Sequence, residues 1–79
     1  MDARLASTLA NVFGLHASDI HEGLTRTDID SWDSLKQMDL LLSLEREYTI
    51  ALDVSEIVRM TSVGAIIDVL REKGASLED

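Results

Sequence analysis

Asp30-Ser31-Trp32-Asp33-Ser34-Leu35-Lys36-Gln37-Met38-Asp39-Leu40 is the stretch that decides the fold, because a polar loop ends and an apolar helical pattern begins within it. Asp is a favoured N-cap, since its carboxylate accepts hydrogen bonds from the unpaired N–H groups of a first helical turn. Asp33 as the cap makes Ser34 the first helical residue, with its hydroxyl toward solvent, where a helix N-terminus favours a phosphate. Asp-Ser before an apolar run also begins many ordinary helices, so a plain cap is the alternative.

Downstream of the cap, residues 34–48 predict a helix with a wide apolar arc. On a wheel of about 100° per residue, the apolar side chains are Leu35, Met38, Leu40, Leu41, Leu42, Leu44 and Tyr48. This arc spans roughly 220°, whereas an ordinary surface helix needs a stripe of about 100°. The helix therefore either lies at the centre of a bundle or presents apolar groups to a ligand or partner, and both can hold.

Upstream of the cap, the pattern predicts a helix over residues 3–13 and then a long connection. Gly14 is placed to stop the helix, whose apolar face is formed by Leu5, Leu9, Val12 and Phe13. A connection as long as residues 15–33 should be pinned or functional. Its expected pins are Leu15, Ile20, Leu24, Ile29 and Trp32, with a short helical turn near Ser18–His21. We expect Trp32 to pack the end of the loop against the bundle, near Leu24 or Ile29.

Two more helices follow. Residues 53–60 predict a short one, with Asp53 and Glu56 spaced as a capping box. The last helix is predicted over about residues 62–73, capped by Thr61 or Ser62 and ended by Gly74. Its apolar face is formed by Val63, Ile66, Ile67 and Leu70, and residues 74–79 are expected to be a flexible tail.

Composition places the chain among small all-α domains. Its 79 residues are 46% hydrophobic with no proline and few aromatic side chains, which favours helices packed on helices. The sequence therefore predicts one domain over residues 1–79, a small antiparallel four-helix bundle with three longer helices, one short helix and a long first loop. About residues 3–73 are expected to be structured.

Charge and cysteine content limit the possible partners. The net charge of −8 argues against nucleic acid and favours basic protein surfaces, which would attract the chain in a salt-dependent way. The absence of cysteine excludes disulfides and cysteine-based zinc sites. No apolar run approaches membrane-spanning length and no signal-peptide layout follows Met1, so we expect a cytoplasmic protein without membrane insertion.

Several motifs at fixed spacing resemble the acyl carrier protein family, the phosphopantetheine-attachment domains. They are Trp32-Asp33-Ser34-Leu35, Met38-Asp39-Leu40, Leu44-Glu45, Tyr48 and Thr61-Ser62-Val63. The resemblance covers about residues 3–73 and includes helix order and total length. Asp-Ser-Leu alone is a weak signal, but together with the downstream motifs it is fairly specific.

The resemblance implies a non-catalytic carrier. The chain has no cysteine, and in this family the cofactor supplies the thiol that the chemistry needs. 4′-Phosphopantetheine from coenzyme A would be attached covalently to Ser34 by a phosphopantetheinyl transferase, and acyl groups would travel on it as thioesters. Asp33 would cap the helix and help the transferase to place magnesium and the serine.

The resemblance to this family also implies which residues contact partner enzymes and which line a cleft for the acyl chain. Partner enzymes, meaning acyl- or aminoacyl-activating ligases and acyl-transferring or synthase enzymes, would meet the chain through their basic patches. The residues expected at these contacts are Leu35, Met38, Asp39, Glu45, Glu47 and Glu56. The residues expected to line an acyl-chain cleft are Leu42, Leu44, Ile57 and Ile66. We expect a free-standing monomer.

Departures from the family pattern leave the cargo open. Lys36 stands where many fatty-acid carriers have an acid, and Arg46 lies within an otherwise acidic run. Asp53 stands where many relatives have proline before the third helix. These departures favour a specialised fatty-acid, polyketide or related pathway. A D-alanyl or other aminoacyl carrier is the alternative, because Trp32 before the motif occurs in several specialised carriers, including D-alanyl carriers. An unmodified acidic helical interaction module is a further alternative.

Other chemistry has less support in the sequence. His16 and His21 lie five residues apart in the loop beside Asp19 and Glu22, but no clear third ligand follows, so we expect solvated histidines and no metal. A hydrolase that uses Ser34 would need an oriented base and an oxyanion hole, and no nucleophile elbow is evident.

Overall fold

All regular secondary structure in residues 1–78, the part of the chain that the computed structural model describes, is helical. The helices are α1 (Ala3–Phe13), α2 (Ser34–Tyr48), α3 (Val54–Arg59) and α4 (Val63–Glu72). Short 3-10 turns cover Ala17–Asp19 and Arg26–Asp28 in the long loop. The predicted all-α class is confirmed. The first 3-10 turn lies close to the turn expected near Ser18, and the second was not predicted.

Side-chain caps set the starts of the helices, because each carboxylate or hydroxyl accepts from an N–H group of the first turn. Asp33 accepts from Lys36 N–H, and Ser62 accepts from Ala65 N–H. Asp53 and Glu56 form the predicted capping box. Gly14 closes α1 with a left-handed φ of 70°, a conformation that glycine adopts at little steric cost. The cap of α1 by Asp2 was not predicted.

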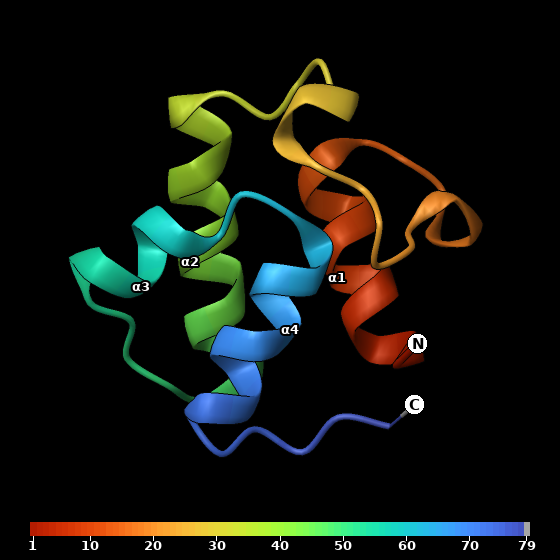
Figure 1. Cartoon of the computed structure of the whole chain (residues 1–79). Coiled ribbons are helices and arrows are strands. Elements are labelled where there is room, and N and C mark those ends of the chain that lie inside the picture. Colours follow the sequence, from red (N-terminus) through yellow and green to blue (C-terminus); the bar gives the residue numbers. More distant parts are fainter. Residues whose placement is uncertain (79) are drawn as a thin grey trace.

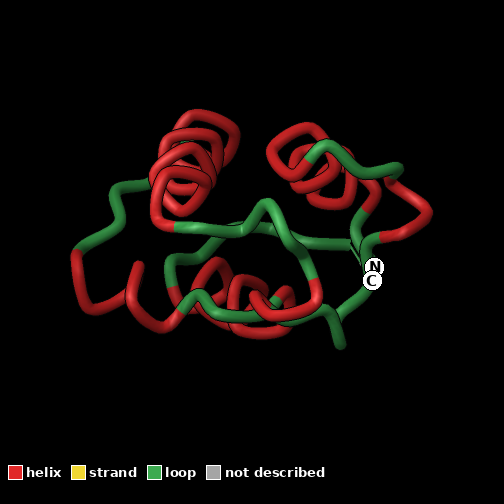
Figure 2. Tube along the Cα trace, turned by 90° about the horizontal axis from the view of Figure 1, so that it is seen from above, coloured by secondary structure: helices red, strands yellow, loops and turns green. Residues whose placement is uncertain are grey.

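The core lies between α1 and α2 on one side and α4 on the other. Seen from above, α1 and α2 lie side by side, α4 faces them, and α3 lies at the edge beside α2 and α4 (Figures 1 and 2). The largest fully buried side chains come from α1, α2, α4 and the residue after α3: Leu5, Leu9, Leu40, Leu44, Met60, Val63, Ile66, Val69 and Leu70. No residue of α3 itself is fully buried.

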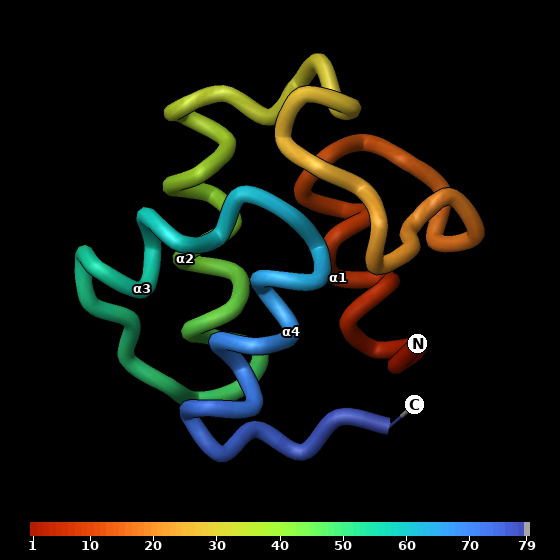
Figure 3. Tube along the Cα trace, in the orientation of Figure 1, coloured from red at the N-terminus to blue at the C-terminus, as the bar shows by residue number. Residues whose placement is uncertain are grey.

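The long loop runs beside α1 before it reaches the start of α2 (Figure 3). Its expected apolar pins do pack on the core: Ile20, Ile29 and Trp32 are buried, and Leu15 and Leu24 are half-buried against it. Backbone hydrogen bonds also tie the loop to the start of α4, since Arg26 N–H donates to Thr61 O at 2.8 Å and Val63 N–H donates to Leu24 O at 2.9 Å. The loop is therefore held at both apolar and polar contacts.

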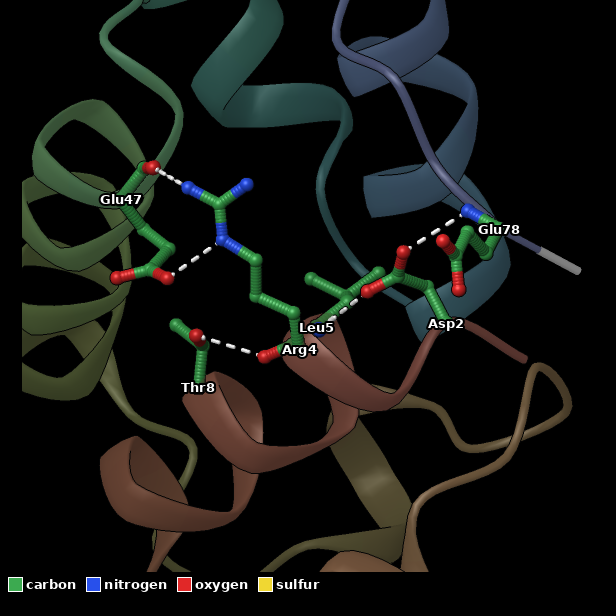
Figure 4. A network of polar contacts seen from close by, with 6 residues as sticks. All are labelled: Asp2, Arg4, Leu5, Thr8, Glu47 and Glu78. Atoms are coloured by element: carbon green, nitrogen blue, oxygen red, sulfur yellow. Dashed lines mark hydrogen bonds and ion pairs between the residues drawn. The ribbon is translucent and has the colours of Figure 1, made fainter.

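Asp2 joins the two ends of the chain (Figure 4). One carboxylate oxygen accepts from Leu5 N–H at 2.8 Å and caps α1, and the other accepts from Glu78 N–H at 2.8 Å. Ala75 and Leu77 pack partly against the core. In residues 75–78, part of the segment expected to be a flexible tail, an acceptor near the N-terminus and apolar contacts link the chain to the bundle; Asp79 lies outside the described residues.

Arg4 joins α1 to the end of α2 (Figure 4). Its Nε donates to Glu47 Oε1 at 2.7 Å, a second guanidinium nitrogen donates to Glu47 O, and the guanidinium lies 4.6 Å from the centre of the Tyr48 ring. A cation over an aromatic face is attracted by the ring quadrupole. Glu47, predicted to meet partner enzymes, thus has a partner within the chain.

Leu42 and Ile66, both expected to line an acyl-chain cleft, differ in burial. The Leu42 side chain is 56% exposed, whereas Ile66 is fully buried. The apolar arc of α2 is wider than the surface that the bundle covers, so its outer part faces solvent.

Truncation should separate these two positions. Ile66→Ala should lower the free energy of unfolding by about 2–5 kcal/mol, because a buried side chain leaves a cavity. Leu42→Ala should change it by no more than about 0.5 kcal/mol, as is usual for surface substitutions. Urea denaturation measures both values, and equal losses for the two variants would contradict the burial assignment.

Acid should release the C-terminal segment before it unfolds the bundle. Hydrogen bonds from the Glu78 and Leu5 N–H groups hold the pKa of Asp2 below its ordinary value. The stabilising contribution of a carboxyl with a lowered pKa is complete above the unfolded value, about 3.9, and is lost as the pH falls through the folded value. The amide resonance of Glu78 in an NMR titration should therefore shift below about pH 4.

Asp2→Asn is the control that removes the titration, because an amide does not titrate in this range and its single oxygen can still accept one of the two hydrogen bonds. In this variant the acid transition of the Glu78 resonance should disappear. A transition of unchanged midpoint in Asp2→Asn would show that another group controls the segment.

Candidate functional site

Ser34 is the exposed first residue of α2. The start of α2 lies at the top of the molecule in Figure 1, away from the chain ends. The preceding Asp33 has an extended backbone, and its Oδ1 accepts from Lys36 N–H at 2.9 Å. No hydrogen bond joins the Ser34 hydroxyl to another group in residues 1–78. The hydroxyl is therefore free to react, while the neighbouring carboxylate is engaged in holding the helix start.

Trp32 fixes the chain just before this position. Its side chain is 3% exposed, and its ring lies 4.6 Å from the ring of Phe13, centroid to centroid. Ser31 Oγ donates to Phe13 O at 3.1 Å, and Arg26 Nε donates to Trp32 O at 3.2 Å. The prediction that Trp32 anchors the end of the loop is confirmed, although the ring contact is with Phe13 of α1.

Gln37 is a site residue that sequence reasoning missed. Its amide oxygen accepts from Trp32 Nε1 at 2.6 Å, and its amide nitrogen donates to Ile57 O at 2.9 Å and Met60 O at 3.2 Å. The side chain is only 9% exposed. A polar residue on the predicted apolar arc was the available signal, because a buried amide needs partners.

Exposed apolar side chains lie on the first turns of α2 and on α3. Leu35 is 74% exposed and Met38 is 50% exposed on α2, while Val54 and Val58 are exposed on α3. Isolated exposed apolar residues are common, but a group beside a reactive position is typical of an interaction surface. One part of the wide apolar arc of α2 is therefore buried in the bundle, and another part is exposed and available to a ligand or partner.

The acids predicted to meet partners differ in their surroundings. Asp39 is exposed and lies 3.8 Å from Lys36 Nζ. Glu45 accepts from Leu52 N–H at 2.9 Å, and Glu56 lies 2.8 Å from Lys73 Nζ. Hydrogen bonding to Glu56 raises the pKa of Lys73. Near the same end of α3, the Ser55 hydroxyl and Glu56 N–H hold the pKa of Asp53 below its ordinary value, so this cap stays ionised.

Three of the four residues predicted to line a cleft lie in or against the core, and the fourth lies elsewhere. Leu44 and Ile66 are fully buried in the core, and Ile57 is half-buried on α3. Leu42 lies on another surface, where it lines an open hollow with Asn11 and Val12 of α1. The structure therefore separates Leu42 from the other three predicted residues.

Two findings bear on other classes of site. Within residues 1–78, no three His, Cys, Asp or Glu side chains are grouped so that they could hold a metal ion. None of the described helices is long and apolar enough to cross a membrane.

Comparison with known proteins supports the resemblance. The family model described as "Phosphopantetheine attachment site" matches residues 3–70. A search of curated protein sequences finds no significant match. Among solved structures, the chain is similar to the solution NMR structure of holo acyl carrier protein from Geobacter metallireducens, with 32% sequence identity and a TM-score of 0.78. The match covers 87% of this chain and 79% of that protein.

These matches confirm the predicted cofactor and the predicted role. The cofactor of this domain is covalently attached 4′-phosphopantetheine, and proteins of this kind are carriers without catalytic activity. The family matches nearly the whole described bundle, including α2 and the loop before it. The chain therefore belongs to the acyl carrier protein family of phosphopantetheine-attachment domains.

Proposed function

We propose that the chain is a single carrier domain that transports acyl groups as thioesters on a 4′-phosphopantetheine arm attached to Ser34. The observation that carries the proposal is the exposed Ser34 hydroxyl, which has no hydrogen-bond partner in the described chain and directly follows the Asp33 cap. A reactive hydroxyl must be reachable by the active site of another enzyme. The start of α2 provides this access on a fixed scaffold.

The residues around Ser34 fit a phosphodiester. At the start of α2, the Asp33 side chain accepts from Lys36 N–H, and Asp33 O accepts from Gln37 N–H. The N–H groups of Ser34 and Leu35 therefore remain without an acceptor among residues 1–78. Free N–H groups and the helix dipole favour a negative charge at a helix start. The start of α2 can thus accommodate the phosphate without disturbing the cap.

The chemistry of the carrier comes from outside the chain. When bound, the arm supplies the thiol that holds an acyl group as a thioester, and the chain has no cysteine to do so. The chain's own residues hold the attachment point: Asp33 keeps the helix start in place, and Trp32 keeps the loop on the core. Ser34 contributes the hydroxyl that becomes the ester oxygen.

We place the partner surface on the exposed face next to Ser34, with Leu35, Met38 and Asp39 at its centre. Phosphopantetheinyl transferase and the enzymes that load and use the arm would meet this face, in the cytoplasm and with the carrier as a monomer. Glu45, Glu47 and Glu56 add negative charge, although each also has a partner within the chain.

The pathway we favour is a specialised fatty-acid, polyketide or related synthesis. Lys36 and Arg46 on α2 and the exposed Val54 and Val58 on α3 make the partner surface less acidic than the net charge of −8 suggests. An aminoacyl cargo, such as D-alanine, is the second candidate, and Trp32 before the attachment motif favours it.

Intact-protein mass tests the proposal after incubation with coenzyme A, magnesium and a broad-specificity phosphopantetheinyl transferase. The parent chain should gain one phosphopantetheine. Ser34→Ala should gain none, because the attachment oxygen is absent. Ser43→Ala is the matched control on the same helix and should gain one as the parent does.

Circular dichroism of each variant shows whether it is folded. A parent chain that stays unmodified with a transferase that modifies another carrier would favour an unmodified interaction module. A gain of mass in folded Ser34→Ala would place the arm on another residue.

A further inference from the structure

Gln37 connects three elements that meet below the attachment point. Its side chain joins α2 to Trp32 in the loop and to the carbonyl groups of Ile57 and Met60 at the end of α3. Its backbone N–H donates to Asp33 O at 2.9 Å. Gln37 therefore holds Trp32 and Asp33, the two residues that precede Ser34, and also the C-terminal end of α3.

The hydrogen-bond chemistry at Gln37 has one consistent arrangement. An indole N–H can only donate and backbone carbonyls can only accept, so the amide oxygen must face Trp32 and the amide nitrogen must face α3. Met has a similar length but neither donor nor acceptor of comparable strength. Loss of the amide would leave the buried indole N–H and a carbonyl without their present partners.

The position of α3 depends strongly on hydrogen bonds and ion pairs to neighbouring elements. The helix has six residues, none of them fully buried. Two ion pairs hold it to α4 and to the residue after α4: the exposed pair of Arg59 with Glu72 at 2.6 Å and the partly buried pair of Glu56 with Lys73 at 2.8 Å. Exposed ion pairs contribute little to stability. The Gln37 amide is the hydrogen-bonded link between α3 and α2 among the described side-chain contacts.

We propose that Gln37 is a positioning residue that couples α3 to the attachment loop, so that Ser34 and the surface formed by α2 and α3 are presented together. The inference rests on the function proposed above. An enzyme that binds both the exposed side chains of α2, such as Leu35, and those of α3, such as Val58, requires their relative position to be correct. Without the Gln37 amide, the arrangement of α2 and α3 that a partner enzyme can bind is only one of several that the chain adopts.

This coupling predicts a change in KM with little change in kcat. When only a fraction of a protein is competent to bind, the apparent affinity falls by that fraction, while the bound complex is unaltered. For Gln37→Met, the KM of the transferase for the carrier should rise roughly tenfold, the scale expected when buried hydrogen bonds are lost. The kcat should stay within about twofold of the parent value.

Val69→Ala is the matched control. Val69 is fully buried on α4 and takes part in none of the hydrogen bonds of Gln37. This variant therefore lowers stability without removing the link between α2 and α3. Its KM and kcat should both stay within about twofold of the parent values at a temperature where both variants are folded. Equal KM values for Gln37→Met and the parent would overturn the coupling, as would an equal rise in Val69→Ala.

NMR hydrogen exchange supplies a second readout. In Gln37→Met, exchange of the Trp32 indole N–H and of the Met60 amide should both be at least tenfold faster than in the parent, whereas in Val69→Ala their ratio to the global exchange rate should be unchanged. Unchanged local exchange in Gln37→Met would also overturn the proposal.

Trp32→Phe tests the same link if Gln37→Met does not fold, because it keeps the ring that packs on Phe13 and removes only the indole donor. It should raise KM in the same direction. Failure of the parent chain to accept the arm would contradict the carrier function, whereas acceptance with the same KM in every variant would contradict only the role of Gln37.

Discussion

The burial of Trp32 is the constraint on which the site depends. Its ring packs on Phe13 of α1, its N–H meets the buried amide of Gln37, and its carbonyl accepts from Arg26. These contacts hold the end of a long polar loop in one place, where the entropy of a free loop would otherwise oppose a fixed position. The Asp33 cap then begins α2 at a defined point, and Ser34 is exposed as a consequence.

Internal contacts also change the meaning of the acidic composition. Glu47 holds α1 through Arg4, Glu56 meets Lys73 after α4, and Glu45 accepts from the backbone of Leu52. These carboxylates act as links between elements as well as sources of negative charge. The surface next to Ser34 is therefore partly apolar, so its recognition should combine apolar contact with electrostatic attraction.

The sequence allowed prediction of features that depend on local chemistry. The caps by Asp33, Asp53 and Ser62 and the stop at Gly14 were predictable because each follows from residues within one turn. Contacts between distant segments were not. The bond of Asp2 to Glu78, the ring contact of Trp32 with Phe13 and the bridge through Gln37 join residues whose proximity is set by packing. The exposure of Leu42 was missed for the same reason, since periodicity defines an apolar arc but not how much of it the bundle covers.

A phosphorus–proton correlation spectrum of the carrier with its arm attached tests the central claim most directly, because it identifies the residue that bears the phosphodiester. The account predicts one correlation from the phosphorus to the β protons of Ser34, at the exposed start of α2. A correlation to the β protons of any other serine, such as Ser31 or Ser43, would contradict it.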